Sequence, residues 1–338
     1  MNANERGTWA IDLHAHVVPG EIIERLGRDG ARFDTRIVET DGRSFFEIAG
    51  RARRPIAPPV RDPAARLPDM DAHRVERQAI SAVPFLMYPE LDAALAAEFA
   101  RAVNDGIAKM AAHESDRFVG VATVGLQDAR SAAAELEHAR GLGFRAVEIP
   151  ARLPGGELDD RALDPFWEAA AALELPVCIH PFDACPVAPF ARFALGNLLG
   201  NGFDTAIAAS LLVFGGVLDR HPKLRVVLRH GGGAFPGLLG RLDWGHGTFA
   251  ECGAAIAAKP SSYVRRFWFD DVTFDAGTLR ALVDRAGADR VVVGSDHPLI
   301  PYARSRVVEQ VDEIGLDEAE RHAILRGNAI DLLGLEKD

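Results

Sequence analysis

Two histidines separated by one residue end an apolar run near the start of the chain, Ile11-Asp12-Leu13-His14-Ala15-His16. In a β-strand, side chains at positions i and i+2 point to the same face, so His14 and His16 would project together. Imidazole nitrogens bind zinc, copper, iron and nickel ions. A pair of this kind is weak evidence on its own, because short motifs often occur by chance as solvated side chains.

Three more residues that could do chemistry follow apolar, β-branched runs. His180, His230 and Asp296 each come directly after such a run or within three residues of it. The carboxyl ends of the strands of a parallel barrel meet at one mouth, so these side chains would gather beside the histidine pair. Neutral imidazoles and a carboxylate are usual zinc ligands. We therefore predict that zinc, with manganese or another divalent metal as alternatives, is bound by four residues: His14, His16, His180 and Asp296.

His230 is then left for proton transfer. A bound metal ion lowers the pKa of its water toward neutrality, and His230 would help to deprotonate that water. The alternatives for His230 are a fifth metal ligand or a group that hydrogen-bonds to a ligand. Asp183, three residues after His180, would orient a ligand or the water, and an ordinary turn residue is an equal alternative.

Strand-like runs alternate with helical stretches along most of the chain, which favours a parallel sheet with right-handed crossovers. Eight such runs predict an α/β fold, a (β/α)8 barrel of the TIM type. The predicted strands are Ala10–His14, Ala79–Phe85, Phe118–Val124, Phe144–Pro150, Pro176–His180, Leu224–His230, Phe267–Val272 and Arg290–Asp296. The predicted helices include Leu91–Glu114, Ala129–Leu142, Ala162–Leu173, Thr278–Ala286, Tyr302–Gly315 and Asp317–Leu333.

A small insertion interrupts this alternation at about residues 30–60, after the first strand. The β-leaning runs Thr35–Val38 and Ser44–Ile48 flank Asp41-Gly42, which is a hairpin signal. Past the hairpin, Arg54 closes a basic cluster that is either a solvated loop or a lip that binds a substrate carboxylate. We see no break in composition, and we predict one domain over residues 1–338.

Composition excludes several classes of protein. The chain has 338 residues, of which 48% are hydrophobic, and a net charge of -11. An acidic balance argues against a nucleic-acid partner. We find neither an apolar run of membrane-spanning length nor a signal peptide, so we predict no membrane association. The 3 cysteines are scattered, which suits a reducing cytoplasm.

Taken together, these motifs resemble the amidohydrolase superfamily, in its single-metal decarboxylase branch, and most of all its aminocarboxymuconate semialdehyde decarboxylases. The His-Gly-Gly-Gly stretch and the terminal Gly-Ser-Asp are the most specific parts of the resemblance. It is carried by Asp12–His16, Arg54-Pro55, His180-Pro181-Phe182-Asp183, His230–Phe235, Leu238–Arg241 and Gly294–Pro298.

The resemblance implies roles for single residues. The four proposed metal ligands match the zinc ligands of this branch, and His230 matches its catalytic histidine. Arg54 matches an arginine that binds a substrate carboxylate, and Arg241 matches a second one that the neighbouring subunit of a homodimer contributes. Phe182, Asp183 and Phe190 would line the substrate pocket, with Phe182 in the place of a tryptophan in the relatives.

We therefore expect a cytoplasmic zinc-dependent decarboxylase that acts without an organic cofactor. Its substrate would be a small carboxylate similar to aminocarboxymuconate semialdehyde or to a hydroxybenzoate. The alternative is a metal-dependent hydrolase of an amide, a lactone or a ring-cleavage product, because the same scaffold permits either reaction. A metal-binding protein without catalytic activity is a further alternative, which the base beside the ligands disfavours.

Overall fold

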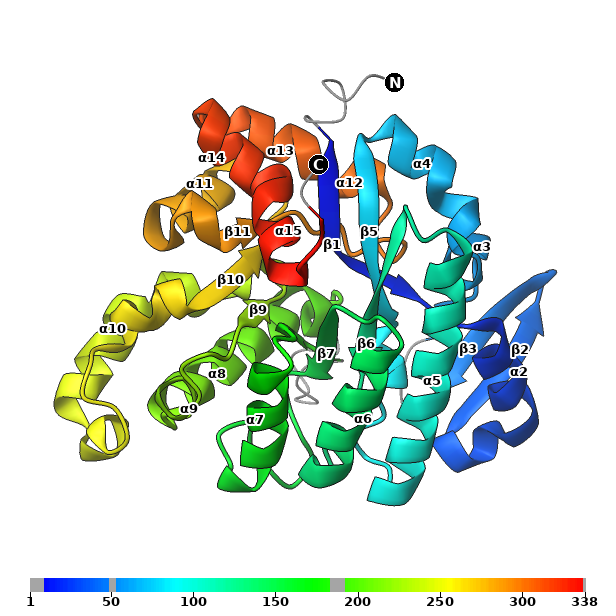
Figure 1. Ribbon diagram of the computed structural model, residues 1–338, viewed down its shortest axis with the longest axis horizontal. Helices are drawn as coiled ribbons and strands as arrows, with labels where there is room; N and C mark the ends of the chain where they lie inside the picture. The colour runs from blue at the N-terminus through cyan, green and yellow to red at the C-terminus, as the bar shows by residue number, and fades with distance from the viewer. Residues whose placement is uncertain (1–8, 49–52, 183–191, 337–338) are drawn as a thin grey trace.

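Eight parallel strands form the centre of the computed structural model, which describes residues 9–48, 53–182 and 192–336. The strands lie side by side in chain order, and helices surround them, as the predicted (β/α)8 barrel requires (Figure 1). They are β1 (Ala10–Val17), β5 (Val75–Ala82), β6 (Phe118–Thr123), β7 (Ala146–Pro150), β8 (Val177–His180), β9 (Val226–Leu228), β10 (Phe267–Asp270) and β11 (Val291–Val292).

The barrel closes between β1 and the segment that follows β11. The backbone N–H of Leu13 donates to the carbonyl of Val293 at 2.8 Å, and that of Asp296 donates to the carbonyl of His14 at 2.8 Å. One step further on, His16 donates to the carbonyl of His297 at 2.7 Å. Closure therefore places the first and last predicted ligands of the chain side by side.

Helices cover the outside of the barrel because each buries an apolar stripe against the strands. Asp92, Asp128 and Asp275 accept backbone hydrogen bonds in the first turns of α5, α6 and α11, which fixes where these helices begin. The larger helices are α5 (Ala93–His113), α6 (Ala129–Gly141), α7 (Asp164–Ala172), α8 (Asn201–Phe214), α10 (Phe235–Thr248) and α11 (Ala276–Ala286). The short helices between strands are α3 (Pro58–Arg61), α4 (Leu67–Ala72) and α9 (Val217–Arg220).

The end of the chain is more broken than the sequence predicts. Arg306 adopts a left-handed backbone, with φ of 51°, and it divides the predicted helix Tyr302–Gly315 into α12 (Tyr302–Ser305) and α13 (Val307–Glu313). The predicted helix Asp317–Leu333 comprises α14 (Glu318–His322), a π-turn and α15 (Asn328–Leu333). The π-turn and α15 pack beside β1 and β11 (Figure 1).

The inserted hairpin is present as part of a three-stranded sheet beside α2 (Gly20–Asp29). β2 (Thr35–Thr40) pairs with β3 (Arg43–Ile48) through a turn whose residues Asp41 and Gly42 both have positive φ. A short third strand, β4 (Arg54–Pro55), pairs with β3 and was missed by the prediction. This sheet and α10 lie on opposite sides of the barrel in Figure 1.

One helical segment among the described residues, Gly196–Phe214, is apolar and long enough to cross a membrane by length and composition, with a hydropathy of 1.2. In this fold it precedes β9 and packs in the helical layer, where 44% of it is buried. A core helix of an enzyme has the same composition, so its hydropathy is weak evidence for a membrane.

Candidate metal centre

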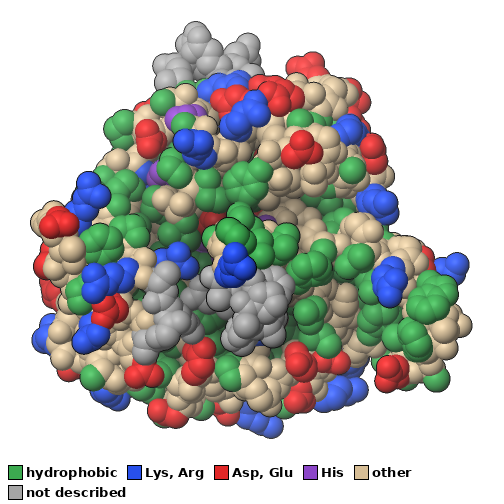
Figure 2. Space-filling view, turned by 180° about the vertical axis from the view of Figure 1, so that it is seen from behind, with side chains coloured by type: hydrophobic (Ala, Val, Ile, Leu, Met, Phe, Trp, Pro, Cys, Tyr) green, Lys and Arg blue, Asp and Glu red, His purple; other side chains and the backbone are tan. Residues whose placement is uncertain are grey.

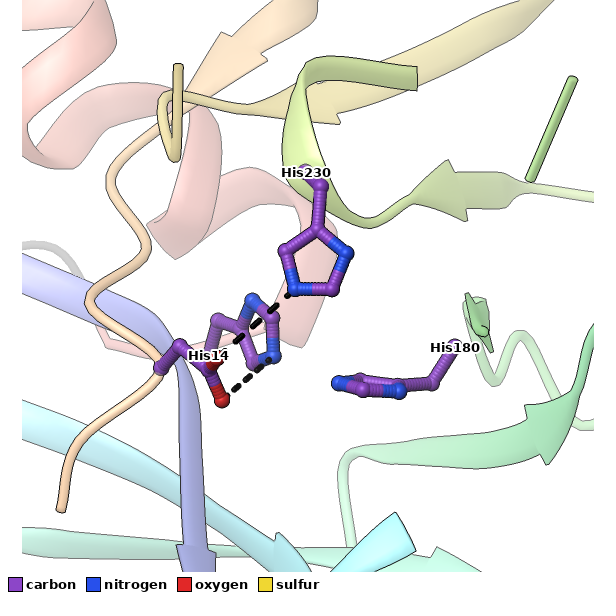
Figure 3. A group of neighbouring side chains, drawn as sticks. His14, His180 and His230 are labelled. Carbon is purple, nitrogen blue, oxygen red and sulfur yellow. Dashed lines mark ion pairs between the residues drawn. The ribbon is translucent and has the colours of Figure 1, made fainter. Parts of the chain in front are cut away.

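The structure brings all five predicted side chains of the metal centre together at the carboxyl end of the barrel. Possible ligand atoms of His14, His180, His230 and Asp296 all lie within 4.8 Å of one another, and the rings point toward a common space (Figure 3). His16 completes the cluster, because its Nε2 lies 3.1 Å from Nε2 of His14 and 3.0 Å from Oδ1 of Asp296.

Three of the histidines present the same nitrogen to this space. Nδ1 of His14 lies 2.7 Å from a carboxylate oxygen of Asp270, and Nδ1 of His16 lies 3.1 Å from the carbonyl of Ala82. Nδ1 of His180 lies 2.5 Å from the carbonyl of Pro181. Carbonyl and carboxylate oxygens only accept, so each Nδ1 must carry the proton and each Nε2 keeps its lone pair. This is the arrangement by which proteins prepare imidazoles to bind metal ions.

Buried atoms without hydrogen-bond partners mark the same space. Within the described part of the chain, Nε2 of His180 and Oδ1 of Asp296 are buried and accept no hydrogen bond. Buried polar atoms are nearly always satisfied, so two unsatisfied atoms within one cluster call for an explanation. A divalent cation would satisfy both, and the donor set of imidazoles and one carboxylate fits zinc.

The charges of the cluster suit a cation. Burial lowers the pKa of His14 well below its usual range and lowers that of His180 to about 3, so both rings are neutral. Burial alone would raise the pKa of Asp296, but the neighbouring imidazoles of His16 and His230 outweigh it and hold the pKa well below its usual range. Neutral imidazoles and an ionised carboxylate are the forms that bind metal.

His230 stands apart from the other three histidines. Its Nε2 lies 3.7 Å from Oδ2 of Asp296, whereas His14 and His16 approach the other oxygen, Oδ1. Burial acts to lower the pKa of His230, but the nearby carboxylate of Asp296 outweighs it and raises the pKa. His230 is therefore the histidine of the cluster that is best suited to carry a proton.

The backbone of His230 and that of Asp296 are strained. His230 has a φ of 55°, and Asp296 has a φ of 57°, both in the left-handed region that disfavours side chains. Such residues cluster at functional sites. Three glycines follow His230 with positive φ, and a Cβ at Gly233 would lie 2.1 Å from the carbonyl oxygen of Gly202. The His-Gly-Gly-Gly motif thus allows a tight turn to pass close to α8.

A buried polar layer beneath the cluster was missed by the sequence analysis. Asp270 ends β10 and holds His14, while Ser81 on β5 lies 3.0 Å from Nδ1 of His16 and donates to Glu148 on β7. Arg229, the neighbour of His230, forms an ion pair with Glu148. The available signal was a polar residue inside or at the end of a predicted strand, where an apolar residue is the norm.

A cavity of about 850 Å³ opens above the cluster. Arg54 and Phe182 both line it, as predicted, and Asp183 and Phe190 lie outside the described residues. Hydrophobic side chains gather around the middle of the face shown in Figure 2. The apolar part of the lining includes Val83, Phe85, Leu198, Phe203, Phe274 and Leu299.

Arg241 is placed differently from Arg54. It lies on α10, as predicted, but it is exposed and does not line the described wall of the cavity. No ion pair of Arg241 with another described residue is present.

A parallel barrel with imidazoles and a carboxylate at its mouth defines the class of metal-dependent (β/α)8 enzymes. The chain belongs to the amidohydrolase family, whose model matches residues 11–335. It is 29% identical to 2-amino-3-carboxymuconate-6-semialdehyde decarboxylase of Dictyostelium discoideum, over 96% of this chain and 92% of the relative.

Two solved decarboxylases share the fold along their whole length. The 5-carboxyvanillate decarboxylase of Sphingomonas paucimobilis matches with a TM-score of 0.84 and 27% identity, over 97% of this chain and 100% of that one. A dihydroxybenzoic acid decarboxylase of Polaromonas, solved with manganese and the inhibitor 2-nitroresorcinol, matches with a TM-score of 0.80 and 26% identity, over 98% of both chains.

Proposed function

We propose that this protein is a metal-dependent, non-oxidative decarboxylase of a small carboxylic acid related to aminocarboxymuconate semialdehyde or to a hydroxybenzoate. The observation that carries the proposal is the shared orientation of His14, His16 and His180, whose Nε2 lone pairs meet beside Oδ1 of Asp296. The names of the relatives support the reaction class, because decarboxylases of both substrate types resemble this chain over nearly its whole length.

His14, His16, His180 and Asp296 would hold the ion. Zinc is our first choice, because histidine and aspartate are among its usual ligands. Manganese is the alternative, and the Polaromonas relative contains it. When bound, the ion would supply Lewis acidity, lowering the pKa of a coordinated water and drawing charge from a substrate oxygen.

His230 would move the proton. It takes up a proton that bulk solvent supplies through the cavity, helped by the neighbouring Asp296 oxygen, and holds it beside the substrate carbon that bears the carboxylate. Carbon dioxide leaves as the carbon–carbon bond breaks, and the electron pair stays on that carbon. The proton from His230 then forms the new C–H bond, so the reaction needs no oxidant and no organic cofactor.

Arg54 would orient the substrate. It lines the same cavity as His180 and His230, and its planar guanidinium suits a carboxylate. Phe182 and the other apolar side chains of the wall favour a flat, conjugated substrate body and exclude water. The roles predicted for Asp183 and Phe190 stay predictions.

A homodimer is part of the proposal, with Arg241 acting in the neighbouring subunit's site. In support, α10 extends away from the barrel (Figure 1) and carries the exposed apolar side chains of Leu238 and Trp244 near the exposed Arg241. Hydrophobic side chains are also visible on this lobe in Figure 2. An exposed apolar patch that adjoins a cation without an ion-pair partner among the described residues suits contact with another protein surface. A cytoplasmic location and a single domain stay predictions.

The experiment that tests the proposal measures the products. Protein loaded with zinc or with manganese is incubated with aminocarboxymuconate semialdehyde and with a panel of hydroxybenzoates. We expect one mole of carbon dioxide per mole of substrate and a product lighter by that mass, and no reaction after chelation of the metal. A product that has gained water without release of gas would establish the hydrolase alternative instead.

A further inference from the structure

Asp270 is a buried carboxylate that touches two parts of the proposed active site at once. It is the last residue of β10 and is 0% exposed. Its Oδ2 lies 2.7 Å from Nδ1 of His14, and its Oδ1 accepts the backbone N–H of Gly231 at 2.9 Å and that of Val272 at 3.3 Å. Gly231 directly follows His230, so one side chain joins a proposed metal ligand to the turn that carries the proposed proton donor.

The orientation of this carboxylate is fixed by its surroundings. Two backbone donors face Oδ1, and backbone donors cannot change into acceptors. Oδ2 is thus the atom that faces His14. Space around the pair is also limited, because a Cβ at Gly294 would lie 2.8 Å from Cβ of Asp270 and 2.9 Å from Cβ of His14. The segment that closes the barrel can therefore pass between the two side chains only because residue 294 is glycine.

We propose that Asp270 is a positioning residue that holds His14 in the Nδ1-protonated form and anchors the turn of His230 through its other oxygen. The inference deepens the proposed function and rests on it. An acceptor at Nδ1 leaves the lone pair of His14 on Nε2, the atom that lies 3.1 Å from Nε2 of His16. A donor at the same place would move the proton of His14 to Nε2 and remove a ligand.

Asp270→Asn makes that exchange with almost no change in shape. The amide oxygen must face the N–H groups of Gly231 and Val272, because an NH₂ group there would oppose two donors. The NH₂ group then faces Nδ1 of His14, which has to accept. We expect the affinity for Zn²⁺ or Mn²⁺ to fall by about 10- to 100-fold, the usual effect of losing a partner of a metal-binding histidine.

The matched control is Asp271→Asn. Asp271 is the next residue, is equally buried, and its Oδ1 accepts the backbone N–H of Gly294 at 2.8 Å. No contact of its side chain with a histidine is found in the described structure. The control therefore repeats the chemical change at the same depth without touching His14, and its metal affinity should equal that of the wild type.

The second contact of Asp270 is tested by turnover at saturating metal. Asp270→Asn keeps an acceptor for Gly231, so excess metal should restore much of its kcat. Asp270→Ala loses both contacts, so its kcat should stay low however much metal is added. Equal recovery of the two variants would overturn the role of Asp270 at the His230 turn.

Metal affinity is measured by competition with a chelator, and folding by the thermal melting of metal-free protein. Wild-type affinity in Asp270→Asn would overturn the inference while leaving the proposed function intact. A wild-type protein that binds neither ion would overturn the proposed function itself. Should Asp270→Asn fail to fold, histidine ¹⁵N spectra of the zinc-loaded wild type still decide. The His14 signals, assigned by their loss in His14→Gln, must show a proton on Nδ1 and none on Nε2.

Discussion

Nη2 of Arg229 lies 2.6 Å from Oε2 of Glu148, and both side chains are fully buried beneath the histidine cluster. Arg229 also donates from Nη1 to the carbonyl of Leu13 at 2.9 Å, so the pair links β7 and β1 to the segment that follows β9. The pair is 0% exposed and adjoins His230 in sequence and His16 in space, at 3.7 Å from Glu148. The ion pair therefore helps to hold the strands that carry the histidine cluster in place.

Removal of one partner should cost far more than the pair contributes, because a buried charge would be left without compensation. We expect Glu148→Gln to lower the free energy of unfolding by about 3–5 kcal/mol, measured by urea denaturation at a fixed metal concentration. The double variant Glu148→Gln/Arg229→Met should lose less than the sum of the two single variants. Additive losses would show that the two residues act independently.

The same variant should show a defined dependence on pH. Burial acts to raise the pKa of Glu148, but the charge of Arg229 outweighs it, so the pKa in the folded protein lies below the unfolded value of about 4.3. The stabilisation is thus complete above the unfolded pKa and is lost as the pH falls through the folded pKa. The difference in unfolding free energy between wild type and Glu148→Gln should stay constant near neutral pH and shrink in acid.

His16 and His230 should respond differently to substitution. His16→Ala should lower the metal content, because it removes an Nε2 that lies 3.0 Å from Asp296. His230→Gln should keep the metal and lose about 10²–10⁴-fold in kcat, the usual contribution of a general acid or base. Metal analysis and steady-state kinetics on both variants check this. The opposite pattern, with metal lost in His230→Gln alone, would make His230 the ligand and His16 the auxiliary residue.

Arg54 has a neighbour that serves as its control. Arg54→Ala should raise KM for a dicarboxylate substrate by about 10- to 100-fold, which corresponds to one charge-assisted hydrogen bond. Arg54→Lys should recover only part of this, because an ammonium is not a planar fork. Arg53→Ala removes an exposed arginine that pairs with Glu47 at 2.7 Å, and its KM should not change. Equal changes in KM at the two positions would show that the basic cluster acts through its overall positive charge and that Arg54 makes no specific contact with the substrate.

The proposed action of Arg241 across a dimer interface predicts complementation. Arg241→Ala and His230→Ala should each be nearly inactive as homodimers. In a mixed dimer, one site would receive both lesions and the other would receive none, so activity should return after subunit exchange. Native mass spectrometry shows whether mixed dimers have formed. Mixed dimers without activity would place Arg241 in its own subunit's chemistry or outside the reaction.

Strand ends were the part of the fold and site that the sequence predicted best. Runs such as Val226–Leu228 carry their own signal, and the residues that follow them converge in any parallel barrel, so His14, His180 and Asp296 met as expected. The predicted start of the second strand, Ala79, was wrong by four residues. β5 begins at Val75, and the polar residues that follow interrupt the apolar pattern: Gln78 donates to Asp12 and accepts from Arg66, and Glu76 pairs with Arg326.

Contacts between distant residues could not be predicted in the same way. Asp270 lay inside a predicted strand, but its proposed role depends on its contacts with His14 on β1 and with Gly231 in the turn after β9. The periodicity of apolar residues in a sequence predicts which face of a strand or helix a side chain lies on. It does not predict which distant residue that side chain contacts. The strand that carries Arg54 was missed for a related reason: two residues are too few to show any period.

The hydrogen bonds between β1 and the segment after β11 determine when the proposed metal site can form during synthesis of the chain. His14 and His16 leave the ribosome early, whereas Asp296 emerges only after every strand of the barrel, so a growing chain cannot assemble the full ligand set. An ion that binds only the closed barrel adds about 4 kcal/mol to the free energy of unfolding when its free concentration is 1,000 times its Kd. Binding of the ion would therefore stabilise the barrel only after it has closed. Metal retention would distinguish intact molecules from nicked or prematurely terminated ones.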